Sequence, residues 1–221
     1  MSLVSSAIIQ DIKVLCEAGG VSMAYFYFDF RDANKQGLRD IVTSFLTQLS
    51  AHSSLCCDIL SELRSVHDNG RKQPSDIVLV KTLKDMLTLP DQRPIYLIVD
   101  ALDESPNTYG IPSPRDMVLQ LVKELVDLRL PNLRICVTGR PEFDIRDALE
   151  SLNPRRLSLH VQNGQKEDIV DYIKSVVYSN SEQLIRRWRT EDKEFVIKVL
   201  SERADGVYVD HFTLAILVQF V

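Results

Sequence analysis

The segment Pro94-Ile-Tyr-Leu-Ile-Val-Asp-Ala-Leu-Asp-Glu104 decides the fold of this 221-residue chain. Its apolar run follows a proline and is rich in Ile and Val, which is typical of a strand buried on both faces of a parallel sheet. Asp100 ends the run, and Asp103 and Glu104 follow one turn later. The acids therefore gather at the carboxyl end of the strand, where open α/β sheets bind ligands. Buried acids at that edge need a cation, hydrogen bonds or a reaction to offset their desolvation.

This acidic segment admits two interpretations. An apolar strand that ends in Asp and continues to Asp-Glu resembles the Walker B segment of P-loop nucleoside triphosphatases. That resemblance implies that the first acid holds Mg²⁺ and that the later acids polarise an attacking water. In the alternative, the strand belongs to the core, and Asp103 or Glu104 caps a solvated helix. The segment alone leaves the choice open.

The composition limits the class of protein. The chain is 45% hydrophobic and 26% charged, so it can bury the core of one large α/β domain, with room for a small helical appendage. A net charge of -5 argues against a general nucleic-acid binder. The cysteines show neither a CxxC pair nor a zinc spacing, which favours reduced thiols over a disulfide framework. HExxH and GxSxG patterns are also missing from the sequence, so metalloprotease and serine-hydrolase functions have no support.

The ends of the sequence point to a soluble, cytoplasmic protein. The first residues lack the basic segment, apolar core and cleavage site of a signal peptide. The apolar stretch 212–221 is interrupted by Gln219 and is too short to span a bilayer. We interpret this stretch as a helix with one exposed apolar face.

Periodicity and turn residues predict the order of elements. We expect strands at 21–30, 94–100, 132–139 and 156–161. We expect helices at 1–17, 38–49, 55–66, 75–87, after Ser113-Pro114, at 143–152, 166–178, 182–188 and 191–204. This order predicts a parallel sheet with right-handed crossovers. Strands give way to helices near Asn163, so we expect an α/β core over residues 1–162 and a helical subdomain over residues 163–221.

Six segments in this order resemble a known family. They are YFYFDF, QPSDIVLVKTL, IYLIVDALDES, LRICVTGRPE, LSLH and EDIVDYI. Together they resemble the NACHT-like (STAND class) signal-transduction NTPases of fungal regulatory proteins, which are similar to the N-terminal domain of nephrocystin-3-like proteins. The resemblance runs from about residue 2 to residue 206. It implies a P-loop NTPase-like three-layer α/β sandwich with a parallel sheet.

The resemblance also implies roles for the acids and for one arginine. Asp100 becomes the acid that organises Mg²⁺, and Asp103 and Glu104 position and activate water, with Glu104 favoured as the base. Arg140, in VTGRPE, falls on the sensor arginine that contacts the γ-phosphate. The alternative for Arg140 is a structural salt bridge at a strand end.

The sequence departs from the family at its beginning. A P-loop NTPase needs a Gly-rich loop ending in Gly-Lys-Ser or Gly-Lys-Thr to hold the phosphates, and this sequence has none. The family helix after that loop is similar to SLVSSAIIQDI, so Ser2 falls on the nucleotide-binding and Mg²⁺-binding Ser/Thr, and Met1 falls on the lysine. The resemblance places the strand before the loop between the strands at 134–138 and 156–161. We therefore expect a truncated or diverged domain, with a gap or two unpaired edges at that position of the sheet.

Two functions remain after these observations. One is a regulatory NTPase switch that binds ATP, or with less support GTP, together with Mg²⁺ and controls effector and repeat domains of a larger protein. The other is a non-catalytic interaction module that keeps the fold. We expect negligible turnover from this chain alone, and homo-oligomers remain open. A nucleic-acid ATPase would need a basic channel that the composition lacks, and the arginines around Trp188 fit a solvated helix face better than a binding patch. We expect neither a nucleic-acid nor a membrane partner.

Overall fold

The computed structural model describes residues 3–90, 92–108, 112–140, 142–158, 170, 171, 174, 175, 177, 178, 188–207 and 213–218. Contacts divide the chain into two compact units. The first comprises Met1–Leu157 and Leu214–Val221, and the second comprises Ser158–Thr213.

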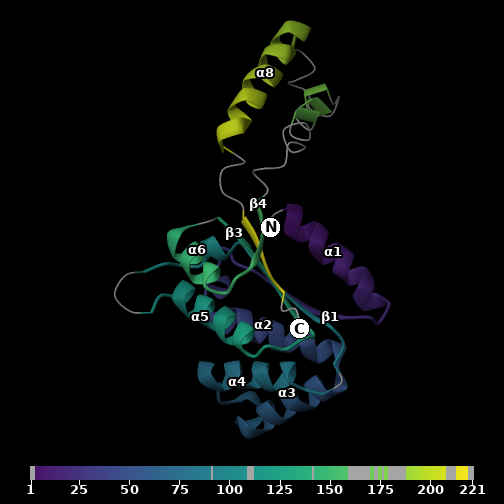
Figure 1. Ribbon diagram of the computed structural model, residues 1–221, viewed down its shortest axis with the longest axis vertical. Helices are drawn as coiled ribbons and strands as arrows, with labels where there is room; N and C mark the ends of the chain where they lie inside the picture. Colours follow the sequence, from purple (N-terminus) through teal and green to yellow (C-terminus); the bar gives the residue numbers. More distant parts are fainter. Residues whose placement is uncertain are drawn as a thin grey trace. The chain divides into compact units, whose positions relative to one another are not determined.

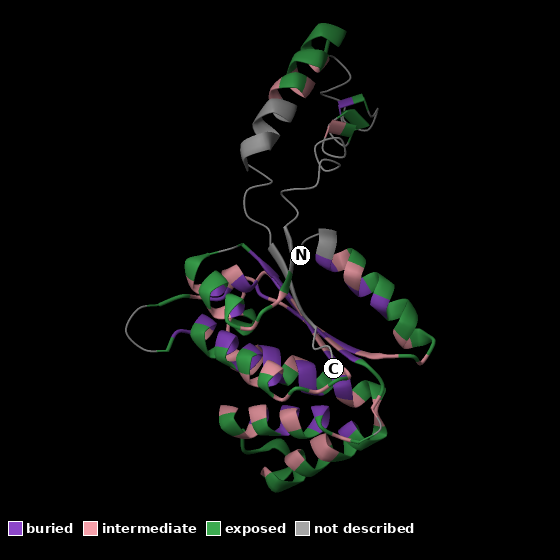
Figure 2. Cartoon of the chain, viewed as in Figure 1, coloured by how far each residue is buried: buried purple, intermediate pink, exposed green. Residues whose placement is uncertain are grey.

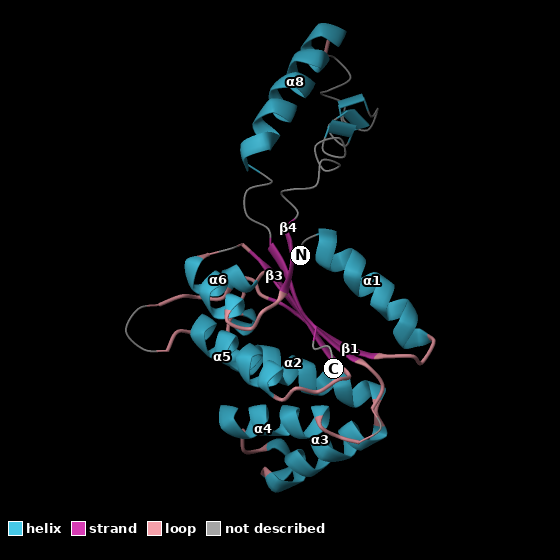
Figure 3. Cartoon of the chain, in the orientation of Figure 1, coloured by secondary structure: helices cyan, strands magenta, loops and turns pink. Residues whose placement is uncertain are grey.

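Three parallel strands form the part of the sheet that carries the acidic segment (Figures 1 and 3). They are β1 (Ser22–Tyr27), β2 (Ile95–Asp100) and β3 (Leu133–Gly139). β2 lies between the other two and is parallel to both. Tyr27 is the register partner of Asp100, and Val99 is that of Val137. The carboxyl ends of the three strands therefore meet at one edge, as the sequence predicted.

Helices cover both faces of this sheet. They are α1 (Leu3–Glu17), α2 (Leu38–His52), α3 (Ser54–Val66), α4 (Asp76–Leu87), α5 (Pro114–Asp127) and α6 (Phe143–Glu150). On one face, α1 packs Ile9 and Ile12 against Met23 and Ile98. On the other face, α2, α5 and α6 contribute to the larger core, and α3 and α4 pack outside α2 (Figure 1). The predicted three-layer α/β sandwich is confirmed.

Burial follows this layering (Figure 2). The β2 residues Ile95, Leu97, Ile98 and Val99 are each at most 1% exposed, as expected for a central strand that is covered on both faces. Because Leu97 and Ile98 belong to different clusters on opposite faces, this one strand holds both cores together.

Local sequence signals explain where the helices begin. Ser75 caps α4 by accepting a hydrogen bond from the backbone of Val78. Ser113 and Asp116 form a reciprocal capping box at the start of α5, and Pro114 occupies the first turn. Both caps were predicted from sequence, because a short polar side chain before an apolar period satisfies free backbone N–H groups.

Two further strands complete the sheet: β4 was predicted at 156–161, and β5 corrects the sequence-based picture. β4 (Arg155–Ser158) is a sheet edge, and β5 (Thr213–Val218) is hydrogen-bonded between β3 and β4 in the order β1-β2-β3-β5-β4. The apolar tail is therefore a strand where we expected a helix. It also occupies the position at which we expected a gap in the sheet. A six-residue apolar run fits either a buried strand or a buried helix, and its sheet neighbours decide between them.

The second unit contains α8 (Thr190–Val207), which matches the helix predicted at 191–204 and continues three residues beyond it. The helices predicted at 166–178 and 182–188 lie largely outside the described residues. The predicted boundary near Asn163 also lies there, and the division into residues 1–162 and 163–221 stays a prediction. No helix among the described residues has the length and apolar character that crossing a membrane requires.

Candidate functional site

Asp100 ends β2 in a closed, polar environment. Its side chain is 0% exposed. The hydroxyls of Ser5 and Thr138 both donate to its Oδ1 atom at 2.5 Å, and the two hydroxyl oxygens lie 3.3 Å apart. Ser5 comes from α1 and Thr138 from β3, so the carboxylate joins three elements. Hydrogen bonds of this kind offset the cost of burying a carboxylate.

A residue in the left-handed backbone conformation turns the chain sharply after Asp100. Ala101 has φ 56° and ψ 46°, a conformation that is uncommon for residues other than glycine. Its backbone N–H donates to Thr138 Oγ1 at 3.3 Å. The short 3₁₀ turn Leu102–Glu104 follows. The turn places Leu102 in the core, at 0% exposure, and brings the next two acids to the sheet edge.

Asp103 faces the loop that follows β3. Its Oδ1 accepts a hydrogen bond from the backbone N–H of Arg140 at 3.0 Å, and its Oδ2 lies 3.6 Å from the Arg140 Nε. Gly139 makes this approach possible, because a Cβ at that position would lie 2.9 Å from Asp103 Oδ1. The Asp103 side chain is 12% exposed, whereas that of Arg140 is 71% exposed. The ion pair thus leaves the guanidinium largely in solvent.

Glu104 lies toward the end of β1. It is half-buried, and its Oε2 accepts a hydrogen bond from the backbone N–H of Phe30 at 3.3 Å. Asp29 precedes Phe30, and hydrogen bonds from the side chain and backbone of Arg31 lower the pKa of Asp29 to about 2. Phe30 is 66% exposed. All three strands therefore contribute side chains or backbone groups to this edge.

Two neighbouring groups respond to the charge of Asp100. Burial raises the pKa of Cys136 to about 12, with a further contribution from Asp100. Burial also raises the pKa of Tyr27, with smaller contributions from Tyr25 and Asp100. Both side chains lie on the face of the sheet that α1 covers. The thiol of Cys136 is accordingly a poor nucleophile near neutral pH.

The structure brings together most of the residues predicted from sequence. Asp100, Asp103, Glu104 and Arg140 lie on the connected ends of β2 and β3. Ser2, predicted to contact nucleotide and Mg²⁺, lies outside the described residues. From α1, the hydroxyl of Ser5, three residues further along the sequence, donates to Asp100.

Sequence reasoning missed four residues of the site. They are Ser5, Thr138, Gly139 and Arg115, a buried arginine in the first turn of α5 that donates to the carbonyl oxygen of Asp103. Gly139 and Thr138 stand directly before the predicted Arg140, so their position was the only signal for them. Ser5 comes three residues after the predicted Ser2, and a spacing of three residues is typical of side chains that share one side of a helix. Arg115 follows a helix cap and gave no signal of its own.

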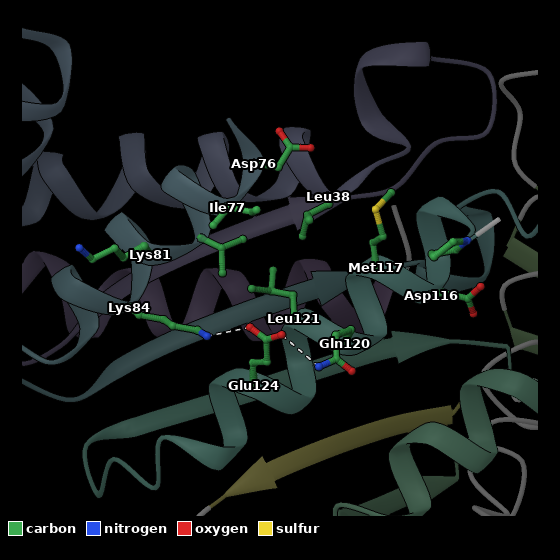
Figure 4. A pocket seen from close by; sticks show the side chains of 12 residues that line it. Leu38, Asp76, Ile77, Lys81, Lys84, Asp116, Met117, Gln120, Leu121 and Glu124 are labelled. Carbon is green, nitrogen blue, oxygen red and sulfur yellow. Dashed lines mark hydrogen bonds and ion pairs between the residues drawn. The ribbon is translucent and has the colours of Figure 1, made fainter. Parts of the chain in front are cut away.

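A separate groove is lined mainly by residues of α2, α4 and α5 (Figure 4). Its volume is about 850 Å³, and Leu38, Val80 and Leu121 are among the apolar residues that line it. Lys84 and Glu124 form an ion pair of 2.7 Å within it. The groove contains none of the predicted site residues, so the acidic edge and this apolar groove are distinct features of the described surface.

The chain matches a known protein family. A family model described as "Nephrocystin 3, N-terminal" matches residues 2–140. The matched segment runs from the start of the chain through all of the candidate acids to Arg140. No curated protein and no solved structure matches the chain.

Proposed function

The chain belongs to the nephrocystin 3, N-terminal family, and on this basis we propose that it is a NACHT-like regulatory NTPase module of a larger protein. Such a module binds a nucleoside triphosphate with Mg²⁺ and hydrolyses it slowly, and the two states differ in conformation. The convergence of Asp100, Asp103, Glu104 and Arg140 at one edge of parallel strands carries this proposal.

The donor atoms at this edge suit Mg²⁺. The cation prefers oxygen ligands and in nucleotide sites commonly uses one or two carboxylates, waters and phosphate oxygens. Asp100 offers a carboxylate, Ser5 and Thr138 offer hydroxyls, and Ser2 would add another hydroxyl. Among the described residues, no group of three or more His, Cys, Asp or Glu side chains could hold a metal ion. When bound, Mg²⁺ would neutralise charge on those phosphates.

The remaining residues divide the work of hydrolysis. Glu104 is half-buried at the edge and takes the proton of the attacking water as general base. Asp103 orients that water and fixes the backbone of Arg140 through its hydrogen bond of 3.0 Å. The exposed Arg140 side chain stabilises negative charge that develops on the transferred group. ATP is the favoured nucleotide and GTP the alternative.

A specific observation supports a second function. Asp100 is fully buried, and both hydroxyl hydrogen bonds converge on its Oδ1 atom. A carboxylate held in this way stabilises the fold without any ligand. The sequence contains no Gly-rich phosphate loop, so phosphate binding would lack its main N–H donors. The second candidate is therefore a non-catalytic protein-interaction module that keeps the NTPase fold.

The partners that fit the first function are other domains of the same protein. NACHT-like switches act between an effector domain and a repeat domain, and the same proposal includes self-association. We place this activity in the cytoplasm, without a nucleic-acid or membrane partner. The acidic net charge of -5 supports the exclusion of nucleic acid.

Titration of fluorescent ATP with Mg²⁺ tests the proposal. The chain is compared with a version in which a strand and a Gly-rich loop ending in Gly-Lys precede Ser2. This version also lacks β5, because β5 lies between β3 and β4, where the added strand would pair. We expect binding by the extended version, loss of about tenfold or more in affinity when it carries Asp100→Asn, and negligible turnover by the chain alone. Competition by GTP identifies the nucleotide. Binding by neither form would overturn the switch and favour the interaction module.

A further inference from the structure

A buried arginine connects the two loops that carry the candidate catalytic residues. Arg115 lies in the first turn of α5 and is 4% exposed. Its Nε donates to the carbonyl oxygen of Ser105 at 3.0 Å, and its Nη2 donates to that of Asp103 at 2.6 Å. These two carbonyls belong to the loop that follows β2. One edge of the guanidinium group thus binds the backbone of the loop that contains Asp103 and Glu104.

The same guanidinium also reaches the loop after β3. Its Nη1 donates to Glu142 and, at 3.2 Å, to Asp144 Oδ2. Glu142 precedes α6, and Asp144 lies in its first turn. Asn107, beyond the acidic loop, donates to the same Asp144 oxygen at 3.0 Å. Arg115 therefore links the chain on both sides of the candidate site.

The chemistry of these contacts requires arginine. A guanidinium offers five N–H donors in a rigid plane, so it can bind two carbonyls and two carboxylates at fixed angles. A lysine ammonium is a point charge and cannot reproduce the fork. Burying a cation is costly unless it is paired and hydrogen-bonded, and Arg115 is paired on both sides. Its cost is offset only while both loops keep their positions.

We infer that Arg115 is a positioning residue that sets the spacing between the Asp103–Glu104 loop and Arg140. It holds the Asp103 backbone from one side, while the Asp103 carboxylate binds the Arg140 N–H from the other. A role of Arg115 in catalysis rests on the proposed NTPase function. Its role in holding the two loops at a fixed spacing does not depend on that function.

Hydrogen exchange of the chain as it exists tests the spacing. Two backbone N–H groups report on the loops: that of Arg140, which binds Asp103, and that of Glu104, which binds the Ala101 carbonyl. In Arg115→Lys we expect both amides to exchange at least about tenfold faster, because the loops lose their shared anchor. Amides of the α2 core should keep their wild-type rates.

Arg39→Lys provides the matched control. Arg39 also binds a carboxylate and a carbonyl, those of Asp76 and Pro74, at 2.5 and 2.8 Å, and these partners lie outside the two loops. We expect it to leave both reporter amides unchanged. Unchanged exchange in Arg115→Lys, or equal acceleration of every amide in the chain, would overturn the positioning role.

A second measurement separates positioning from general stability. In the version extended by the Gly-rich loop, Arg115→Lys should lower kcat by about tenfold or more, while the nucleotide Kd stays within about twofold. Arg39→Lys should change neither. A rise in the nucleotide Kd of Arg115→Lys without a fall in kcat would contradict the positioning role. If no version binds nucleotide, the proposed function fails, and the exchange result still decides whether Arg115 spaces the loops.

Discussion

Asp100 and Glu104 lie four residues apart in one acidic segment, yet the structure places them in opposite environments. Asp100, Ser5 and Thr138 form the closed half of the site, where the carboxylate is 0% exposed and held by two hydroxyls. Glu104 and Arg140 form the open half, where the guanidinium side chain is 71% exposed and the carboxylate is half-buried. Acids of one motif can therefore contribute very differently to stability, and substitutions can separate fold from chemistry.

Removing the carboxylate of the closed half should have the largest effect. Asp100→Ala leaves the hydroxyls of Ser5 and Thr138 without their shared acceptor in a buried position. We expect a loss of about 2–4 kcal/mol in the free energy of unfolding, measured by urea denaturation. Asp58→Ala, an exposed acid on α3, is the control and should stay within about 0.5 kcal/mol. Equal losses in the two variants would show that the buried carboxylate of Asp100 stabilises the fold no more than an exposed carboxylate does.

The close approach of Gly139 to Asp103, which joins the two halves, should give the second-largest effect when it is disturbed. Gly139→Ala puts a Cβ 2.9 Å from Asp103 Oδ1 and 3.3 Å from the backbone nitrogens of Leu102 and Asp103. The 3₁₀ turn must shift, and we expect a loss of about 1–3 kcal/mol by overpacking. Gly20→Ala, whose Cβ would lie at an ordinary 3.5 Å from the Leu15 carbonyl, is the control. Thermal unfolding of both variants compares them, and a Gly139→Ala protein as stable as wild type would show that the turn yields freely.

The sequence predicted the part of this architecture that depends on local pattern. The apolar run at 95–99 predicts strand β2. The helix caps Ser75 and Ser113 are predictable because they depend on short-range hydrogen bonds. β5 could not be assigned, because its apolar run fits a helix as well as a strand until its neighbours β3 and β4 are known. Pairing between distant segments is information that periodicity does not contain.

The same division holds for the site. The positions of Asp100 and Arg140 were predictable, because carboxyl ends of adjacent parallel strands meet at one edge. The contact between Ser5 and Asp100 depends on how α1 crosses the sheet, and Arg115 depends on where α5 begins relative to two loops. Such contacts between elements leave no spacing signal in the sequence. Their chemistry becomes visible only when the elements are assembled.

The charge of the closed half should also be detectable through Cys136. The pKa of Cys136 lies at about 12, above the ordinary value of 9.0, mainly because of burial and further because of Asp100. Since the folded state keeps the proton to higher pH, this thiol contributes stability that is present below pH 9 and is lost as the pH rises toward 12. Asp100→Asn removes the smaller cause and should lower the pKa of Cys136.

Alkylation rates between pH 8 and 11 measure this shift. We expect Asp100→Asn to increase the rate at Cys136 about threefold or more, with Cys56 as the internal control, because burial raises the Cys56 pKa without any contribution from Asp100. A profile of Cys136 identical in both proteins would show that the carboxylate does not act on the thiol. Faster reaction at both cysteines would indicate general opening of the fold.

The open half should give the smallest change in stability. Arg140→Ala removes an ion pair of 3.6 Å between a mostly exposed guanidinium and Asp103, but the backbone N–H that binds Asp103 remains. Exposed ion pairs contribute little, so we expect the free energy of unfolding to change by less than about 0.5 kcal/mol, measured by the same urea denaturation. A loss as large as that of Asp100→Ala would make Arg140 a structural salt bridge, the alternative that the sequence left open. A negligible loss of stability would show that the Arg140 guanidinium does not hold the fold together and is available to bind a phosphate.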